Sequence, residues 1–426
     1  MTDYQEFLAS KRRREMPTGR VVDPGEVHPR LYDWQREFVV WAVRTGRAAL
    51  WWDTGLGKTA AQIEWARLSG RRTLIVAPLA VCHQTIEEAA ELDVKATYVR
   101  GSDQAQGPGL WITNYEMVGH FDPSDLDAVV LDEASILKNH TGKTRNALIQ
   151  HFAKVPYRLA CTATPAPNDP AELTSQAEFL GVMRRPEMLA TYFINDGKEW
   201  RLKHHGRASM FHWMATWAAA LRSPADVGYP AGRYNLPPLK IRTHLVETHG
   251  LYALGGVTGR AEMRAATVDD RVARAVRLVE AEPQEPWLLW CGRNDEAAAL
   301  AADIPGAVNV HGSMSPEEKA EHLLAFAHGE IKHLVTKPSI AGFGMNWQHC
   351  ARTAFVGLSD SWEQYYQAIR RCWRYGQTRP VHAHIVLSDI ESGIAENVSR
   401  KDREASRMVT EMVAAMNHIR NGGAGI

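Results

Sequence analysis

The residues best placed to do chemistry begin with a glycine-rich segment near the start of the chain. Trp52-Asp53-Thr54-Gly55-Leu56-Gly57-Lys58-Thr59 follows the apolar run ALWW and precedes the helix-like run AAQIEWARL. In a loop between a strand and a helix, inward-pointing backbone N–H groups can bind phosphates, Lys58 can reach the β- and γ-phosphates, and the Thr59 hydroxyl can bind Mg²⁺. Because Trp52 stands where the full pattern has its first glycine, an ordinary Gly-rich turn is the alternative interpretation.

Two adjacent carboxylates form a second candidate site. The apolar run AVVL ends in Asp132 and Glu133. A buried strand would place Asp132 at its carboxyl end, where it can hold magnesium, with Glu133 beside it to orient and deprotonate water. Such a pair is most often a solvated strand end, but the GKT loop earlier in the same domain favours catalysis.

Two arginines in the second half could act on an anion. Arg371 and Arg374 are three residues apart on a predicted helix that starts after Ser361, so they project from one helix face. A guanidinium pair offered to a bound γ-phosphate is what an arginine finger requires, and such a residue can raise turnover by about three to five decades. Taken alone, the pair would be interpreted as a basic, solvated helix turn.

Further candidates lie in loops of the second half. Gly342 and Gly344 follow the strand-like run HLVTK, and glycines there permit a close approach of the backbone to a ligand. His311 also follows a strand-like run. It is either a nucleic-acid contact or a structural histidine, and the two interpretations have equal weight.

A basic stretch in the middle of the chain interleaves charge with an aromatic residue. It runs from Lys198 to Arg207 and contains Trp200 and Arg201. This pattern makes Lys198 and Arg201 candidates for gripping a nucleic-acid backbone. A solvated surface with Trp200 in a core explains the pattern equally well.

These side chains need elements to position them, and the apolar pattern predicts two α/β domains. In both halves, short apolar runs alternate with amphipathic segments, as in parallel sheets covered by helices. The runs are ALWW, TLIVAP, LWIT, AVVLDEA and RLACTATP in the first half, and PWLLWC, AVNVH, HLVTK, TAFVGL and HAHIVL in the second. The clearest helix start is a capping box between Ser315 and Glu318. We predict an N-terminal lobe over residues 1–170, a helical insertion or bridge over 171–245, a C-terminal lobe over 246–388, and C-terminal helices over 389–426 that pack back on the lobes.

Composition limits the class of protein. The 426 residues (47.6 kDa) carry 49 Lys and Arg against 49 Asp and Glu, and 45% are hydrophobic, which excludes disordered, collagen-like and disulfide-scaffold classes. No apolar run reaches the roughly 18 to 20 residues that span a bilayer, and no secretion signal is visible. We expect a soluble protein in the cytoplasm of a bacterial or phage-infected cell. Five scattered cysteines predict reduced thiols and no zinc site.

The acidic pair and its neighbours resemble the motifs of superfamily-two helicases. Asp132-Glu133-Ala134-Ser135 resembles the second motif in its DEAH-like form, with Ser in the last place. Leu31-Tyr32-Asp33-Trp34-Gln35 resembles the glutamine motif, which implies that Gln35 recognises adenine. Val76-Ala77-Pro78-Leu79 and Thr113-Asn114-Tyr115-Glu116 are similar to motifs that contact nucleic acid, and Thr162-Ala163-Thr164-Pro165 is similar to the motif that couples hydrolysis to movement.

The second half carries strings that belong to the same set. QAIRRCWRYGQ, which ends at Gln377, closely resembles the last helicase motif, with Arg370 where an acidic residue is more usual. The segment from Thr336 to Asn346 resembles the fifth motif, which touches nucleotide and nucleic-acid backbone. Within the superfamily, the GLGKT loop, Lys138-Asn139, and Thr164-Pro165 followed by Asn168 are most similar to Swi/Snf-type translocases. Trp52 and Ser135 depart from that pattern.

The resemblance implies a fold and a set of site residues. The fold is α/β, with two RecA-like parallel-sheet lobes, a helical insertion between them and a C-terminal helical extension. The expected catalytic residues are Lys58, Asp132, Glu133, Arg371 and Arg374, and the expected nucleotide-binding residues are Gln35, Thr54, Gly55, Gly57, Lys58, Thr59, Gly342, Gly344 and Gln377. Magnesium is expected to bind Thr59 and Asp132, and hydrolysis is expected to be coupled to movement by Thr162 and Thr164. Nucleic-acid contacts are expected from Pro78, Asn114, Tyr115, His311 and Lys337, and the basic stretch adds Lys198 and Arg201.

The predicted activity is that of an ATP-dependent nucleic-acid motor. The resemblance implies Mg-ATP hydrolysis between two lobes and tracking along double-stranded DNA. An RNA-remodelling helicase and an ATP-gated binding module without turnover are the alternatives, and RNA or single-stranded DNA could take the place of duplex DNA. We expect a monomeric motor with no membrane partner; the sequence identifies no protein partner.

Overall fold

The computed structural model describes residues 16–139, 142–197, 200–247, 264–341 and 345–422. The chain divides into two compact units. The first unit contains the residues up to Ala231 and those from Glu404 onward, and the second unit is Gly232–Arg403.

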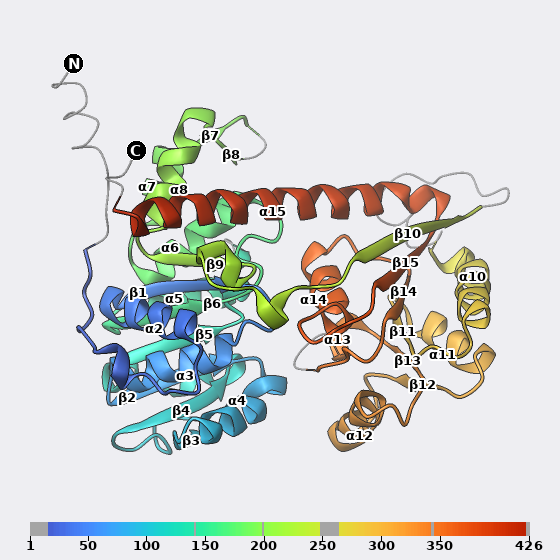
Figure 1. Cartoon of the computed structure of the whole chain (residues 1–426), viewed down its shortest axis with the longest axis horizontal. Coiled ribbons are helices and arrows are strands. Elements are labelled where there is room, and N and C mark those ends of the chain that lie inside the picture. Colours follow the sequence, from blue (N-terminus) through green and yellow to red (C-terminus); the bar gives the residue numbers. More distant parts are fainter. Residues whose placement is uncertain (1–15, 140–141, 198–199, 248–263, 342–344, 423–426) are drawn as a thin grey trace. The chain divides into compact units, whose positions relative to one another are not determined.

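The first unit is built on a sheet of seven strands in which every pairing is parallel. Figure 1 shows these strands side by side, with helices packed around them. In sheet order the strands are β3 (Ala96–Tyr98), β4 (Gly109–Asn114), β2 (Arg72–Ala77), β5 (Ala128–Asp132), β6 (Tyr157–Cys161), β1 (Arg47–Trp52) and β9 (Ala218–Leu221). The apolar runs ALWW, TLIVAP, LWIT, AVVLDEA and RLACTATP correspond to β1, β2, β4, β5 and β6, as predicted.

Helices of the first unit connect these strands. They are α2 (Asp33–Thr45), α3 (Lys58–Ser69), α4 (Leu79–Glu91), α5 (Lys143–His151), α6 (Leu173–Leu180), α7 (Arg185–Tyr192) and α8 (Arg207–Met214), with the antiparallel hairpin β7 (Phe193–Asn195) and β8 (Trp200–Leu202). Short 3₁₀ turns follow β4 (η2, Tyr115–His120) and β5 (η4, Ala134–Lys138). Because the paired strands are parallel, the loops that leave their carboxyl ends meet at one edge of the sheet.

The second unit has its own parallel sheet. Its strands, in sheet order, are β10 (Leu239–Val246), β15 (Val381–Ser388), β14 (Arg352–Val356), β11 (Trp287–Cys291), β13 (His333–Thr336) and β12 (Ala307–Val310). Its helices are α10 (Val268–Ala281), α11 (Asn294–Asp303), α12 (Pro316–Ala327), α13 (Pro338–Ala341) and α14 (Trp362–Cys372). In Figure 1, α10 and α11 lie on one side of this sheet, and α13 and α14 on the other. The α/β class with two parallel sheets is therefore confirmed.

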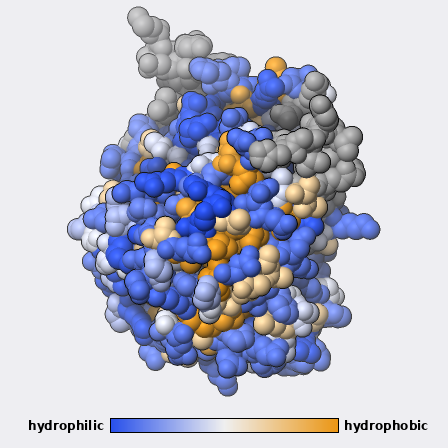
Figure 2. Space-filling view, turned by 90° about the vertical axis from the view of Figure 1, so that its right-hand side faces the viewer, coloured by the Kyte–Doolittle hydropathy of each residue, from blue (hydrophilic) through white to orange (hydrophobic). Residues whose placement is uncertain are grey.

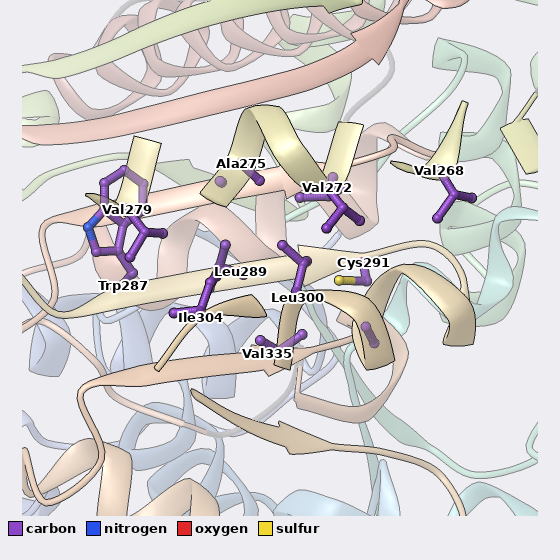
Figure 3. Packing of buried hydrophobic residues seen from close by; sticks show 13 residues of the cluster. Val268, Val272, Ala275, Val279, Trp287, Leu289, Cys291, Leu300, Ile304 and Val335 are labelled. Atoms are coloured by element: carbon purple, nitrogen blue, oxygen red, sulfur yellow. The ribbon is translucent and has the colours of Figure 1, made fainter. Parts of the chain in front are cut away.

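A hydrophobic cluster fills the space between α10, α11 and the sheet of the second unit (Figure 3). Val272, Ala275 and Val279 of α10 face Trp287 and Leu289 of β11, and all five are buried. Their spacing of three and four residues is that of one helix face, which explains the amphipathic pattern of this segment. On the face shown in Figure 2, a band of hydrophobic side chains is bordered by hydrophilic ones.

A buried ion network lies where the second sheet's strands end. The Arg271 side chain pairs with Glu296, and neither is more than 1% exposed. Glu296 also accepts hydrogen bonds from the backbone N–H groups of Gly292 (3.1 Å) and Arg293 (3.0 Å). The network therefore fixes the turn between β11 and α11 by charge-assisted bonds.

The segment between residues 171 and 245 differs from the predicted helical bridge. It contains α6, α7 and α8, but β9 pairs with β1 in the first sheet and β10 pairs with β15 in the second. The sequence AAAL of β9 lacks the β-branched and aromatic residues that mark a strand, so its pattern gave no signal. The division between the units falls after Ala231.

The capping box predicted at the start of α12 is present. The Ser315 hydroxyl accepts a hydrogen bond from the Glu318 N–H (3.1 Å), and the Glu318 carboxylate accepts one from the Ser315 N–H (2.8 Å). The C-terminal segment forms one helix, α15 (Ser392–Arg420), whose residues from Glu404 onward belong to the first unit. Within the described residues, no helix is both long and apolar enough to cross a membrane.

Candidate functional site

The glycine-rich loop joins β1 to α3. β1 ends at Trp52, α3 begins at Lys58, and both Gly55 and Gly57 have positive φ angles (81° and 76°). Lys58 Nζ donates to the carbonyl oxygens of Trp52 (2.9 Å) and Asp53 (3.3 Å). These bonds hold its ammonium group at the loop, and α3 directs its N-terminus, where anions are stabilised, to the same place.

Gln35 of α2 contacts this loop. Its Nε2 donates to the Leu56 carbonyl (2.9 Å), and its Oε1 accepts from the Tyr32 N–H (2.9 Å). A Cβ atom on Gly57 would lie 2.3 Å from Gln35 Nε2, so a side chain at this position would have to displace the loop or the Gln35 amide. The predicted contact of Gln35 with adenine stays a prediction, since both ends of its amide already bind the backbone.

Trp52 has a packing role that explains its departure from the usual loop sequence. Its side chain is fully buried, with its ring centroid 5.1 Å from that of Trp34 and 5.9 Å from that of Phe38, both on α2. The indole therefore anchors the helix that carries Gln35 to the strand that leads into the loop. Aromatic pairs of this kind add to the free energy gained from area burial alone.

The two carboxylates lie at the end of β5, as predicted. Asp132 is the last residue of β5, and burial raises its pKa, while the charge of Lys58 acts in the opposite direction. Glu133 has a left-handed backbone (φ 54°, ψ 51°), which is rare for a residue with a side chain. The Ser135 hydroxyl is hydrogen-bonded to the Glu133 carbonyl (3.5 Å), so the residue in the last place of the motif supports this turn.

The coupling candidates are brought next to the acidic pair. The Thr162 hydroxyl donates to Glu133 Oε2 (3.5 Å) and accepts from the Thr164 N–H (3.0 Å), and both threonines are fully buried. A change in the position of the Glu133 carboxylate would therefore alter a hydrogen bond of the loop after β6. The next residue of that loop, Pro165, accepts a hydrogen bond from Gln176 of α6 (2.8 Å).

Glu88 of α4 is a carboxylate at this edge that sequence reasoning missed. Burial, followed by the charges of Glu91 and Asp132, raises its pKa to about 7, while hydrogen bonds from the Thr59 hydroxyl and the Ala60 N–H oppose that rise. The run IEEAAEL reads as a solvated helix face, and its pattern carries no sign that one glutamate approaches the glycine-rich loop. A third carboxylate thus lies near Thr59 and Asp132.

The residues at this edge fit a magnesium nucleotide. Lys58 and the loop N–H groups suit phosphate oxygens, and the Thr59 hydroxyl and Asp132 carboxylate are oxygen ligands of the kind that Mg²⁺ prefers. Among the described residues, no group of three or more His, Cys, Asp or Glu side chains could hold a metal ion by itself. Such an ion would need phosphate oxygens as further ligands, as Mg²⁺ usually does.

Three predicted nucleic-acid contacts follow β2 and β4. Pro78 is the N-cap of α4 and is half-buried. The Asn114 amide is engaged on both sides, because its Oδ1 accepts from the Tyr98 hydroxyl (2.6 Å) and its Nδ2 donates to Glu116. The Tyr115 hydroxyl donates to the Asp132 carbonyl. Asn114 and Tyr115 thus support the edge internally, and their contact with nucleic acid stays a prediction.

In the second unit, the two predicted finger arginines share one acceptor. The prediction that both lie on one helix face is wrong, because α14 ends at Cys372 and Arg374 lies in the turn after it. Arg371 Nη1 and Arg374 Nη1 each donate to the Met345 carbonyl at 3.2 Å. Burial, together with the charge of Arg370, lowers the pKa of Arg374 to about 10, and the side chain stays protonated at neutral pH. Gln377 is buried and its Nε2 donates to the carbonyls of Cys350 (3.1 Å) and Cys372 (3.4 Å), which is a structural role; its contact with nucleotide stays a prediction.

His311 and Lys337 line one pocket of about 590 Å³ at the ends of β12 and β13. The His311 ring is hydrogen-bonded to the Ser313 hydroxyl (2.8 Å), and the buried Oδ1 of Asn309 in the pocket wall has no hydrogen-bond partner among the residues that the structure describes. Polar atoms and a lysine therefore converge on one hollow. Arg201 of β8 is exposed and pairs with Asp196 (3.0 Å), whereas Lys198, Gly342 and Gly344 lie outside the described residues.

The burial of Asp132 predicts a measurable effect on stability. A carboxyl whose pKa is raised in the folded state binds its proton more tightly there, so wild-type stability falls as pH rises from the ordinary Asp range through the raised pKa. Asp132→Asn removes the buried charge, so at neutral pH without nucleotide it should raise the unfolding temperature by a few degrees. The exposed control Asp103→Asn should leave it unchanged. A lower unfolding temperature for Asp132→Asn than for wild type would contradict this explanation.

Two protein families match the two halves of the chain. The family described as SNF2-related domain matches residues 30–190, and the family described as helicase conserved C-terminal domain matches residues 270–376. The chain is also similar to the solved Sulfolobus solfataricus SWI2/SNF2 ATPase core in complex with dsDNA, at 17% identity and a TM-score of 0.44 over 94% of this chain and 98% of that chain. A search of curated proteins found no match.

The two family matches together take up more than half of the chain, and each falls on one of the two parallel sheets. They correct the DEAH-like interpretation of residues 132–135, because DEAD and DEAH proteins form a different branch of the superfamily. With an SNF2-related domain followed by a helicase C-terminal domain, the chain belongs to the Swi/Snf type of superfamily-two helicases, which are nucleic-acid-dependent ATPases.

Proposed function

We propose that this protein is a motor that hydrolyses Mg-ATP and translocates along double-stranded DNA. The observation that carries the proposal is the arrangement at the carboxyl edge of the first sheet. There Lys58, Asp132 and Glu133 lie together, and Thr162 connects them to the next loop. The side chains proposed for phosphate binding, for water activation and for coupling to movement thus lie at one edge of the sheet.

Hydrolysis would begin with the phosphates bound at the glycine-rich loop. The loop N–H groups and Lys58 would bind the β- and γ-phosphates and hold the γ-phosphate in position for attack. Thr59 and Asp132 would hold magnesium, which supplies charge neutralisation of the phosphate oxygens. Glu133, the residue directly after β5, would orient the attacking water and accept its proton.

The second unit would contribute Arg371 and Arg374. Both guanidinium groups are held by one carbonyl oxygen, and a pair of this kind stabilises the charge that develops on the transferred phosphoryl group. We propose that one ATP is bound by residues of both units. Loss of the γ-phosphate would then remove contacts that favour one arrangement of the units over another, and Thr162 would pass the change to the loop after β6.

Duplex DNA is proposed as the track because the sequence resembles those of Swi/Snf-type translocases, and that resemblance implies movement along duplex DNA. The pocket of His311 and Lys337 is the best described candidate for a phosphate of the backbone, since it combines a lysine with hydroxyl and imidazole groups. Contacts of this type are independent of sequence and weaken as salt rises.

The turnover of ATP tests the assignment of the first unit. Glu133→Gln should lower the DNA-stimulated rate by about two to four decades while ATP still binds, because the base is lost and the shape of the side chain is nearly kept. Lys58→Ala should lower binding and turnover together. The exposed controls Glu87→Gln and Lys95→Ala should behave as wild type. Full turnover in Glu133→Gln, or no stimulation by duplex DNA, would defeat the proposal, and stronger stimulation by RNA would favour an RNA-remodelling helicase.

The glycine-rich loop offers a second test with a closely matched control. Gly57 and Gly107 have the same φ of 76°, but an added Cβ would meet Gln35 Nε2 at Gly57 and nothing within 4 Å at Gly107. Both alanine variants share the backbone cost of about 1 kcal/mol. Only Gly57→Ala displaces the loop from Gln35, so we expect its affinity for ATP to fall at least tenfold and that of Gly107→Ala to stay unchanged in equilibrium binding. Equal affinities in the two variants would contradict a role of this loop in binding phosphate.

A further inference from the structure

Arg370, which precedes the first finger arginine, lies in a cage of aromatic rings. It is 1% exposed, and its Cζ atom is 4.9 Å from the ring centroid of Trp373, 5.5 Å from that of Tyr375 and 5.8 Å from that of Tyr366. The negative face of an aromatic ring attracts a guanidinium group, and most strongly where water is excluded. The rings come from α14 and the turn directly after it, so they fix the C-terminal end of that helix around the Arg370 side chain.

The same rings hold the first residues of the second unit. Tyr234 packs edge-on against Tyr375, with ring centroids 4.9 Å apart and an interplanar angle of 80°. Trp373 Nε1 donates to the Pro237 carbonyl at 2.7 Å. The chain crosses from the first unit to the second after Ala231, so this incoming segment (residues 232–238) is fastened to the cage within a few residues of the crossing.

Arg371 and Arg374 are bound at the same end of α14. Both donate to the Met345 carbonyl, and the Arg371 carbonyl accepts from the Trp347 N–H at 3.0 Å. Three buried or largely buried guanidinium groups thus lie between residues 370 and 374, at the end of α14 and in the turn after it. Their mutual repulsion would push this turn apart unless each charge has a fixed partner, and the aromatic faces supply one for Arg370.

We propose that Arg370 is a positioning residue for the arginine pair. Its aromatic cage holds the end of α14 in the register that presents Arg371 and Arg374 to the phosphates, and it transmits movement of the incoming segment to that pair. This inference rests on the proposed function, in which the pair acts on ATP. An acidic residue, which is more usual at this place in the motif, would be repelled by the ring faces. Arg370 and its three rings therefore form one structural unit.

The test uses the full-length protein and the variant Arg370→Lys. Lysine keeps the charge and the aliphatic stem but loses the flat guanidinium that stacks on the rings. Misplaced finger arginines weaken only the transition state, so we expect kcat of DNA-stimulated hydrolysis to fall at least about tenfold with KM for ATP within twofold of wild type. Affinity for ADP–aluminium fluoride should fall in the same proportion, and affinity for ADP should not change. The control Arg277→Lys, on the exposed face of α10, should match wild type in every measurement.

Two further variants separate positioning from general destabilisation. Tyr375→Leu removes a ring of the cage, and Tyr234→Leu removes the contact of the incoming segment, and neither changes an arginine. Both should show the same fall in kcat at unchanged KM. The double variant Arg370→Lys/Tyr375→Leu should be no slower than the slower single variant, because both changes disrupt the same interaction between residue 370 and the aromatic cage. Thermal unfolding of each variant establishes that the assayed protein is folded.

The outcomes distinguish this inference from the function on which it rests. If Arg371→Ala and Arg374→Ala keep full turnover, the finger assignment fails and the positioning role falls with it. If those variants lose turnover while Arg370→Lys and Tyr375→Leu keep the wild-type kcat, or change KM alone, the positioning role is overturned and the finger assignment stands.

Discussion

Parallel pairing of β1, β5 and β6 is the constraint on which the chemistry of the first unit depends. Parallel strands end at the same edge, so the loop after β1, the carboxylates after β5 and the threonines after β6 must meet there although they are separated by about a hundred residues of sequence. The burial of these strands also excludes water from Asp132, whose raised pKa is the electrostatic consequence. A nearby positive charge lowers the cost of burying that carboxylate, and the charge of Lys58 acts in this direction.

The departures from the usual motifs have structural explanations. Trp52 is a core residue that joins α2 to β1, and Ser135 supports the turn that gives Glu133 its left-handed backbone. Arg370 is enclosed by Tyr366, Trp373 and Tyr375. None of these substitutions removes a group that the proposed hydrolysis needs. They change what holds the loop, the acidic pair and the arginine pair in place, which is a weaker constraint on residue type than the chemistry itself.

Much of this arrangement could be predicted from the sequence because buried parallel strands are apolar runs and turns with chemistry are short motifs. The runs that become β11 to β15, the glycine-rich loop and the capping box at Ser315 all carry such local signals. What could not be predicted depends on distant partners. β9 is a strand only because β1 pairs with it, Glu88 reaches the site only through the packing of α4, and the Asn114 amide is engaged by Tyr98, sixteen residues away in sequence. No local pattern encodes such contacts.

The central claim is that ATP hydrolysis at the first sheet's edge drives movement along duplex DNA. Displacement of a third strand from a DNA triplex measures that movement directly, because a translocating motor removes the strand without separating the duplex. We predict that wild-type protein with ATP displaces the third strand, and that Glu133→Gln, although it binds ATP and DNA, does not. Displacement by Glu133→Gln at the wild-type rate, or separation of the duplex strands in place of the third strand, would contradict the claim.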